Sequence, residues 1–557
     1  MGQPSTTPAR PQWLVFAVIS FVALLASMPG LLGSWVGDDF HMLSSRYYGE
    51  WTHVWDVFTR NARHYQVADE VPTMSGPYRP VTMFTLLLSH VLVPKPWLHH
   101  LLSWLLHIGT GALLYLALLR QASSDARSSA RPVALFLTAI FLLHPVAVEV
   151  YVWINGRSDL MAGFFLAALA AALLRRWSDW RWQALAIAPL AFLGAGSKLP
   201  FVVAAVALWL GVAFRLPDRR FRWTAGAPLF AGIGFYLFLR WIYVPFFERF
   251  GAAENILFDV SVWAEVPQLL AMSADALLAF RAEAMQSLAW ELHKPMSAGE
   301  WVGAAALLGA GIGLAWRRDI GGLAYFIGAA LTIAPCVVVS QSIWLGFDRY
   351  LYMPSILLLL AGAPYVSSAV DAWSQRRALV WGVAAALLLV AAIGTRTASL
   401  AYVNHSAYEH AMLTDHPDDL TIFFYYARTS SESAQPELAR QALAKMPGPP
   451  WPEALIMPVF VLSTALSDVR TRDIAMAHTL ESHSNNPVLR AHAMRWKYNR
   501  GEVSDALALA VSFEAVDPLC PEVRRQLELW SRQSNLGATR DSIDAAANEM
   551  RCAGDPD

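Results

Sequence analysis

Charged residues are scarce in this chain. Only 15% of the 557 residues are Asp, Glu, Lys or Arg, whereas 56% are hydrophobic. Ordinary soluble domains carry about 25% charged residues, and a disordered chain needs low hydrophobicity and high charge. A soluble fold cannot hide this much apolar surface. The composition therefore predicts a polytopic membrane protein.

Cysteine is also scarce, since the chain has only Cys336, Cys520 and Cys552. Three thiols are too few for a disulfide scaffold or a four-thiolate metal site. The net charge of −1 excludes a strongly basic nucleic-acid binder. The sequence contains no Gly-rich phosphate loop, no nucleophile elbow and no HExxH zinc pair. We therefore expect neither a metal nor a bound cofactor.

Long apolar runs dominate the first 396 residues. A membrane helix needs about 20 mostly apolar residues, and we expect spans at 13–33, 98–119, 132–150, 159–175, 184–196, 201–215, 224–243, 301–316, 321–340, 350–370 and 378–395. A short run at 80–93 is the open choice, because counting it as a span inverts every later loop. We interpret it as a re-entrant segment.

The distribution of arginine decides between these topologies. With 80–93 left out of the count, fifteen Arg residues fall in short loops on the side of the N-terminus, as the positive-inside rule requires. The loop 244–300 then lies on the other side, with eight acidic and three basic residues. We predict a cytoplasmic N-terminus and a C-terminus that is periplasmic, or lumenal in a eukaryote. The Arg- and Ala-rich composition favours a bacterial inner membrane.

The composition changes after residue 396, where polar residues return. The stretch 397–557 contains short amphipathic helices broken by Pro and Gly, and 501–518 is typical of a degenerate tetratricopeptide repeat. An irregular helical domain is the alternative. Cys520 and Cys552 both lie here, and an oxidising compartment permits a disulfide between them, although their spacing alone does not show one.

We therefore predict an all-α protein with two parts. Residues 1–396 form a membrane helix bundle of about 11 spans, with outer loops at 34–97 and 244–300. Residues 397–557 form a helical, repeat-like domain outside the membrane.

Ionisable residues gather on the predicted outer face, where they are costly and mark function or ion pairs. The residues concerned are Asp38 and Asp39; Tyr78 and Arg79; His144 and Glu149; Arg157 and Asp159; Lys198; and Asp348, Arg349 and Tyr352. Structural alternatives exist for several of them. Glu149 and Arg157 could form an ion pair, as could Asp348 and Arg349. Lys198 could extend to the membrane interface.

This layout favours one kind of chemistry. A carboxylate at the membrane surface can act as a general base on a hydroxyl. Arg and Lys at the same depth can bind a phosphate and stabilise the charge on it as it leaves. A lipid-linked phosphate reaches such a site sideways from the bilayer. The pattern predicts sugar transfer from a lipid phosphate to an acceptor on the outer face.

The order of the polar segments points to a known family. The segments are GDDF, then YRPVTMFTLLLSHVLVPKPWLHHLL, then FLLHPVAVEVYVWINGRSDLMAG, then SKLPFV, then DRYLYMPSILLLLA. In this order they resemble the membrane part of the transmembrane-and-tetratricopeptide-repeat O-mannosyltransferases. More widely, they resemble the C-type glycosyltransferases, which include the protein O-mannosyltransferases and the aminoarabinose transferase of lipid A. The similarity covers most of 13–395.

The resemblance implies roles for single residues. The catalytic acid of the first outer loop falls on Asp38 or Asp39, and the sequence does not choose between them. The implied ligands of the lipid phosphate are Arg349, then Lys198, with Arg157 as a further candidate. The family's Lys-Glu pair is matched only at Lys198, because Leu199 follows it. The implied pocket residues are Tyr78, Arg79, His144, Glu149, Asp159, Asp348 and Tyr352.

The function implied is that of an inverting glycosyltransferase that uses a polyprenyl-monophosphate sugar. The carrier would be dolichyl phosphate in a eukaryote and undecaprenyl phosphate in a bacterium. We expect a protein acceptor, docked on 400–557, and membrane lipids but no nucleic acid as partners. Two alternatives stay open. The acceptor could be lipid A or another envelope glycolipid, or the chain could be a non-catalytic, membrane-anchored scaffold.

Overall fold

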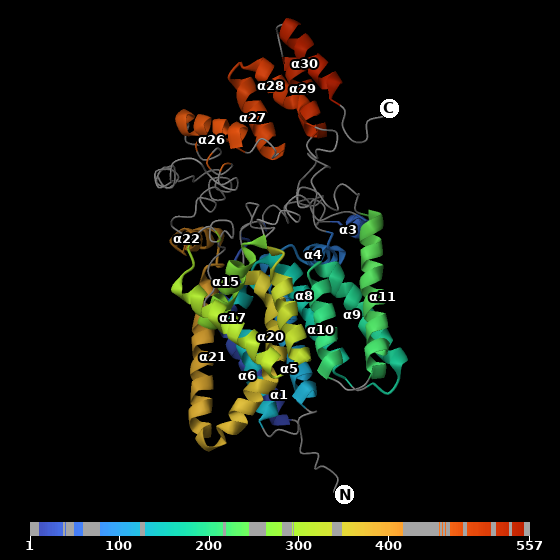
Figure 1. Cartoon of the computed structure of the whole chain (residues 1–557), viewed down its shortest axis with the longest axis vertical. Helices are drawn as coiled ribbons and strands as arrows, with labels where there is room; N and C mark the ends of the chain where they lie inside the picture. The colour runs from blue at the N-terminus through green and yellow to red at the C-terminus, as the bar shows by residue number, and fades with distance from the viewer. Residues whose placement is uncertain are drawn as a thin grey trace.

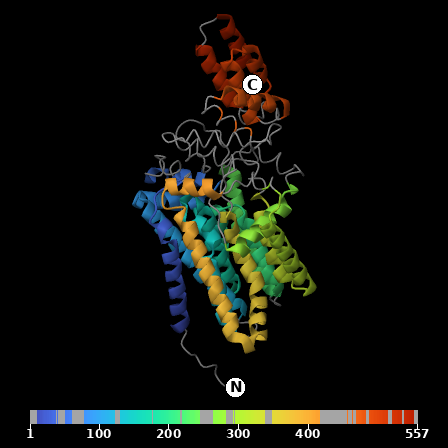
Figure 2. The same cartoon turned by 90° about the vertical axis from the view of Figure 1, so that its left-hand side faces the viewer.

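The computed structural model is helical throughout the part of the chain it describes, with no strand there. It describes residues 10–36, 39, 50–59, 78–122, 129–175, 177–215, 219–243, 263–280, 292, 295–336, 348–415, 456, 459, 463, 468–482, 487–513, 520–533 and 537–550. A bundle of long helices begins at the lower end of Figure 1 with α1. The red helices α26–α30 lie beyond its upper end in both views (Figures 1 and 2).

The bundle consists of helices of very different length. The longer ones are α1 (Arg10–Leu31), α5 (Pro96–Ala122), α6 (Ala130–Leu143), α8 (Arg157–Leu173), α9 (Trp180–Ser197), α10 (Phe201–Arg215), α11 (Arg219–Tyr243), α17 (Ala298–Trp316), α18 (Ile320–Ile333), α20 (Tyr352–Ala372) and α21 (Arg377–Leu400). The shorter ones are α3 (Val54–Thr59), α4 (Pro80–Leu92), α7 (Val148–Val152), α15 (Val266–Ala279) and α22 (His405–Asp415). Single 3-10 turns are η2 (Trp51–His53), η4 (Pro145–Ala147), η5 (Ile154–Gly156), η6 (Asp348–Leu351) and η7 (Ser374–Arg376).

Each predicted apolar run is helical in its described residues. Fewer helices than predicted, however, are long enough to cross a membrane. Seven helices of the described chain have the length and composition of a span, and the bent pair α6–α7 would add an eighth. Helices α10 and α18 have 15 and 14 residues. At a rise of about 1.5 Å per residue they fall short of a hydrocarbon core of about 30 Å. The long apolar helices indicate an integral membrane protein.

Helix α8 lies at the centre of the bundle and packs against α5, α9, α10 and α20. Its sequence is rich in Ala, and most of its residues are buried. At Gly163 a Cβ atom would lie 2.4 Å from the Tyr352 ring, so the small residue lets α20 approach closely. Such close approach through small residues is how apolar helices pack in a membrane.

The predicted run 132–150 is a broken helix. Helix α6 ends at Leu143, and the residue after it, His144, is extended because the next residue is Pro145. The chain then turns through η4 into α7, bent by 55° from α6. The His144 side chain accepts the Val146 N–H at 3.3 Å and so caps the new turn. The short helix α7 after this break carries Glu149 in its first turn.

The C-terminal helices are α26 (Val469–Ser482), α27 (Pro487–Asn499), α28 (Val503–Val511), α29 (Cys520–Gln533) and α30 (Gly537–Glu549). Helices α27 and α28 pack as a hairpin, and so do α29 and α30. Gly501 adopts φ +81° at the turn after α27. The Glu502 N–H reaches the Lys497 carbonyl and the Gly501 N–H reaches that of Tyr498, which is the Schellman arrangement. Cys520 is disulfide-bonded, whereas Cys336 is free and buried. Cys552 lies outside the described residues.

Candidate functional site

Charged side chains from five parts of the chain meet at the end of the bundle where α4 begins. We name this set the charged cluster: Arg79, Glu149, Asp159, Lys198, Arg349 and Tyr350. Arg349 donates to Glu149 twice, from its backbone N–H at 2.9 Å and from its guanidinium at 3.3 Å. Tyr350 links the two halves, since its hydroxyl accepts from Arg349 at 3.1 Å and its ring lies 4.2 Å below the Lys198 ammonium.

The second half of the charged cluster surrounds Asp159. Lys198 Nζ lies 2.5 Å from the Asp159 carboxylate, and both side chains are buried. Arg79 donates to the Ser158 hydroxyl at 3.2 Å, and that hydroxyl donates to Asp159. Asp159 lies in the first turn of α8, where the helix dipole favours a negative charge. Lys198 follows the last residue of α9 in an extended conformation, which points the chain toward Pro200 and α10.

Three cations of the charged cluster lie close together. Arg79, Lys198 and Arg349 lie beside the carboxylates of Glu149 and Asp159, and the buried carboxylates of Asp39 and Asp348 lie nearby. Lys198 and Arg349 are 4% and 8% exposed, so water and salt screen their charges little. The three cationic groups together offer several charge-assisted donors to a phosphate.

The same surroundings alter the acid–base behaviour of Lys198. Burial lowers the pKa of Lys198 to about 8, and the positive charges of Arg79 and Arg349 act in the same direction. The Asp159 carboxylate opposes this shift but does not cancel it. Burial likewise lowers the pKa of Arg79. Lys198 is thus a cation that gives up its proton in mildly alkaline solution.

Asp39 lies on a different side of the cluster. It is fully buried, and its carboxylate accepts the Asn155 N–H at 3.1 Å and the Val36 N–H at 3.4 Å. The Asn155 contact ties Asp39 to η5, the turn that joins Glu149 to Asp159. The structure therefore brings Asp39 close to the charged cluster. Asp38 lies outside the described residues.

Tyr402 is a site residue that sequence reasoning missed. It follows α21 and is 3% exposed. It lies close enough to interact electrostatically with Glu149, Asp348, Arg349 and Asp39. Burial and these three carboxylates raise the pKa of Tyr402 well above 10.0. The phenol is thus neutral at ordinary pH and lies near both Asp39 and Arg349. No polar motif marks it in the sequence, and only the packing of α1 on α21 places it there.

Arg157 has other partners than those expected of a phosphate ligand. Its guanidinium donates to the Ser103 and Ser89 hydroxyls, at 3.2 and 2.9 Å, and to the carbonyls of Thr85 and His99, at 3.4 and 2.8 Å. These groups belong to α4 and α5. Arg157 does not pair with Glu149, which binds Arg349 instead. Through these hydrogen bonds Arg157 connects α8 to α4 and α5.

Three more predicted pocket residues have partners outside the charged cluster. Tyr78 donates its hydroxyl to the Phe58 carbonyl at 2.6 Å. Tyr352 shares a hydrogen bond of 2.9 Å with His107 inside the helix bundle. The His144 Nε2 lies 2.9 Å from the Leu277 carbonyl. Asp348, in η6, is 2% exposed and lies close enough to Tyr402 to affect the pKa of that phenol. These contacts hold the surrounding helices together.

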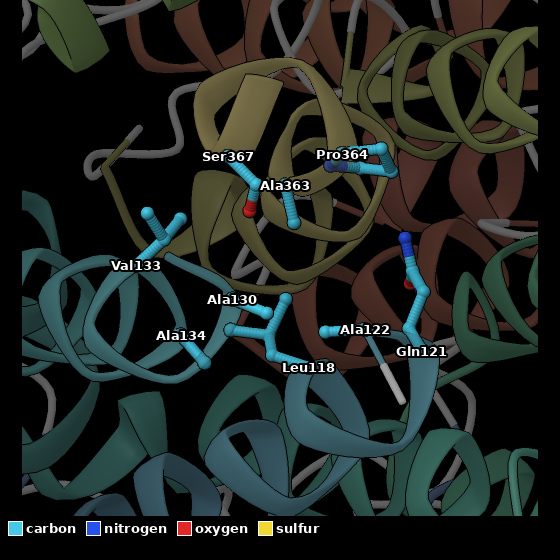
Figure 3. Close-up of a pocket in the computed structure, with 9 residues that line it drawn as sticks. All are labelled: Leu118, Gln121, Ala122, Ala130, Val133, Ala134, Ala363, Pro364 and Ser367. Atoms are coloured by element: carbon cyan, nitrogen blue, oxygen red, sulfur yellow. The ribbon is translucent and has the colours of Figure 1, made fainter. Parts of the chain in front are cut away.

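No group of three or more His, Cys, Asp and Glu side chains is placed to hold a metal ion in the part of the chain that the structure describes. Two adjoining apolar cavities, of about 460 and 150 Å³, lie beside α20. A third, at the far end of α20, is shown in Figure 3, where Ala363 and Ser367 face Leu118 and Ala134. It measures about 20 Å³, which is room for one water molecule, so it is no substrate site.

Comparisons of the chain with protein-family models, with curated proteins and with solved structures found no match. The geometry of the site and the resemblance of its segments are therefore the basis for assigning a function.

Proposed function

We propose that this protein is an inverting glycosyltransferase that takes a sugar from a polyprenyl monophosphate. The observation that carries the proposal is the convergence of Arg79, Lys198 and Arg349 in one charged cluster. A glycosyl phosphodiester brings one negative charge, which these cationic groups are suited to bind. Arg349 presents a planar guanidinium suited to phosphate oxygens, and Lys198 adds a second charge-assisted donor.

The reaction uses the acidic pair Asp38 and Asp39 for the acceptor and the cations of the charged cluster for the donor. An acceptor hydroxyl loses its proton to Asp38 or Asp39, and its oxygen attacks the anomeric carbon. The bond from that carbon to the phosphate oxygen breaks, and the electron pair leaves with the polyprenyl phosphate. The phosphate then carries a second negative charge, which Arg349, Lys198 and Arg79 stabilise. The attack from the opposite face inverts the anomeric centre.

The proposal includes an arrangement in the membrane. The bundle crosses the membrane about 11 times. The short helices α9, α10 and α18 complete their crossings together with residues of the neighbouring loops, and α4 is re-entrant. The charged cluster and 397–557 lie on the outer face. The C-terminal helices form a tetratricopeptide-like surface that holds a protein acceptor, because helical repeats present extended binding surfaces.

The test is transfer of radiolabelled sugar from a panel of polyprenyl-phosphate donors to an envelope extract by purified protein in lipid. We expect transfer by the wild type and a loss of about 100-fold or more in Asp38→Asn or Asp39→Asn. Asp541→Asn, on α30, is the matched control and should keep full activity. Equal transfer by all four proteins would refute the assignment of the base. Absence of transfer by the folded wild type from every donor would favour the scaffold alternative.

A further inference from the structure

One buried imidazole contacts both of the elements that lead to the Glu149–Arg349 pair. His107 of α5 is 1% exposed, and its Nδ1 lies 2.9 Å from the Tyr352 hydroxyl at the start of α20. Its ring also stacks on Tyr151 of α7, with the ring centroids 4.7 Å apart. Arg349 stands three residues before Tyr352, and Glu149 stands two residues before Tyr151. Both partners of the ion pair are therefore joined to one ring through short stretches of backbone.

The hydrogen bonds of His107 indicate which of its nitrogens carries the proton. Nε2 lies 3.2 Å from the Leu142 carbonyl oxygen, which can only accept, so Nε2 donates. In the neutral ring Nδ1 is then the acceptor, and the Tyr352 hydroxyl donates to it. One side chain of α5 thus binds both α6 and α20. Because the Tyr352 hydroxyl has a defined acceptor, the first turn of α20 has a defined rotation about its axis.

Tyr151 is held by α1 as well as by His107. Its hydroxyl lies 2.7 Å from that of Ser27. Ser27 gives its own proton to the Ala23 carbonyl at 2.7 Å, so Tyr151 is the donor between the two hydroxyls. Helix α7 has only five residues, too few to be stable by itself. These contacts of Tyr151 therefore determine where α7, and with it Glu149, lies.

We propose that His107 is a positioning residue for the donor phosphate, an inference that rests on the proposed function. The imidazole sets the position of α7 relative to the turn η6, which carries Arg349. The Glu149 carboxylate then accepts both the backbone N–H and the guanidinium of Arg349, and this fixes the direction in which the guanidinium faces a phosphate. Orientation matters because a displacement of about 1 Å in a binding group can reduce a rate by about 100-fold.

The test removes the hydrogen bond of His107 from either end. Tyr352→Phe deletes only the hydroxyl, His107→Leu deletes the imidazole, and a double variant lacks both. Tyr325→Phe on α18 is the matched control, because the Tyr325 hydroxyl is buried and has no hydrogen-bond partner within the described residues. The dissociation constant for undecaprenyl phosphate and the melting temperature are measured for each purified protein in detergent, which needs no turnover.

We expect Tyr352→Phe to weaken binding of the lipid phosphate by about tenfold, because the Arg349 guanidinium loses its fixed direction. The double variant should bind no more weakly than His107→Leu, since both changes remove the same hydrogen bond. In an Arg349→Lys background Tyr352→Phe should change the affinity by less than about twofold, because the planar guanidinium is already absent. Tyr325→Phe should bind as the wild type does.

Two results would overturn the inference. One is a lower melting temperature of Tyr352→Phe with unchanged affinity, which would leave His107 a packing residue while the proposed function stands. The other is an undiminished loss of affinity in the Arg349→Lys background, which would show that the effect does not pass through Arg349. Failure of the folded wild type to bind the lipid phosphate would instead contradict the proposed function itself.

Discussion

Lys198 has to be a cation to bind a phosphate, although it is buried among other cations. Its ammonium lies beside Asp159 and over the Tyr350 ring, while Arg79 and Arg349 oppose its charge. Because the pKa in the folded protein is lowered to about 8, the cation is present below that pH and is lost as the pH rises through it. The donor site is therefore sensitive to alkaline pH through this residue.

We predict that kcat/KM for the donor falls by about tenfold between pH 7 and pH 9, as the protonated fraction of Lys198 falls. A pH profile of transfer measures this. Lys198→Arg supplies the comparison, because a guanidinium stays charged over the whole range and should remove the alkaline decline. An identical decline in Lys198→Arg would assign it to another group.

At the scale of the element, turns and helix ends hold the charged groups in place. Gly156 in η5 is one of them. A Cβ atom there would lie 2.7 Å from the Glu149 carbonyl oxygen and 2.9 Å from the Val150 Cα. Both are backbone atoms of α7, which cannot move aside without displacing the Glu149 carboxylate. The close approach therefore requires glycine between the two halves of the charged cluster.

Gly156→Ala should destabilise the protein by about 1–3 kcal/mol, the usual cost of overpacking, and should also reduce transfer. Thermal unfolding in detergent and the transfer assay measure the two effects. Gly382→Ala is the matched control, because nothing lies within 4 Å of its added Cβ and Ala favours the helix over Gly. Equal melting temperatures for the two variants would contradict this account of η5.

A second element, the start of α18, is fixed by Asp319. Its carboxylate accepts the Gly322 N–H as an N-cap, pairs with Arg215 of α10 at 2.6 Å, and accepts the Tyr365 hydroxyl of α20 at 2.8 Å. Burial tends to raise the pKa of Asp319, but these hydrogen bonds outweigh it and lower the pKa below 3.8. The stabilisation is present above that pH and is lost as the pH falls further.

Asp319→Asn should cost about 1–3 kcal/mol, because Asn keeps the cap but loses the charge that Arg215 requires. Asp179→Asn is the control, since Asp179 caps α9 at 2.9 Å and forms no ion pair within the described residues. Thermal unfolding at neutral pH should separate the two variants. The gap between wild type and Asp319→Asn should narrow as the pH falls below 3.8, and a constant gap would contradict the ion-pair explanation.

At the scale of the whole molecule, apolar patterning predicts the helices well and their exact lengths poorly. The runs at 98–119 and 224–243 became α5 and α11, but 132–150 broke at His144, since Pro145 cannot continue α6. The charged residues near Lys198 and Arg349 were found because ionisable groups are rare in such a sequence. The sequence did not reveal Tyr402 as a site residue or the hydrogen-bond partners of Arg157, because a single sequence does not show which distant helices pack together.

The side of the membrane is also a property of the whole chain. Cys520 is disulfide-bonded, and disulfides persist in oxidising compartments, which agrees with an outer location for 397–557. We predict that a membrane-impermeant maleimide applied to whole cells labels a thiol released from the Cys520 disulfide only after reduction. The free, buried Cys336 should react only after denaturation. Labelling of the C-terminal helices without reductant, and only in permeabilised cells, would place them in the cytoplasm and contradict the proposed topology.

The most direct test of the account is the affinity of the charged cluster for a polyprenyl phosphate. Arg349→Gln alone would leave Glu149 buried and unpaired, so the double variant Glu149→Gln/Arg349→Gln is measured beside Arg349→Lys, with Arg376→Gln as an exposed control. We predict that the double variant binds the lipid phosphate at least about 30-fold more weakly, the effect of losing a buried charge-assisted contact. Arg349→Lys should fall between, and Arg376→Gln should equal the wild type. Equal affinity of the folded double variant and the wild type would contradict the central claim that Arg349 binds the donor phosphate.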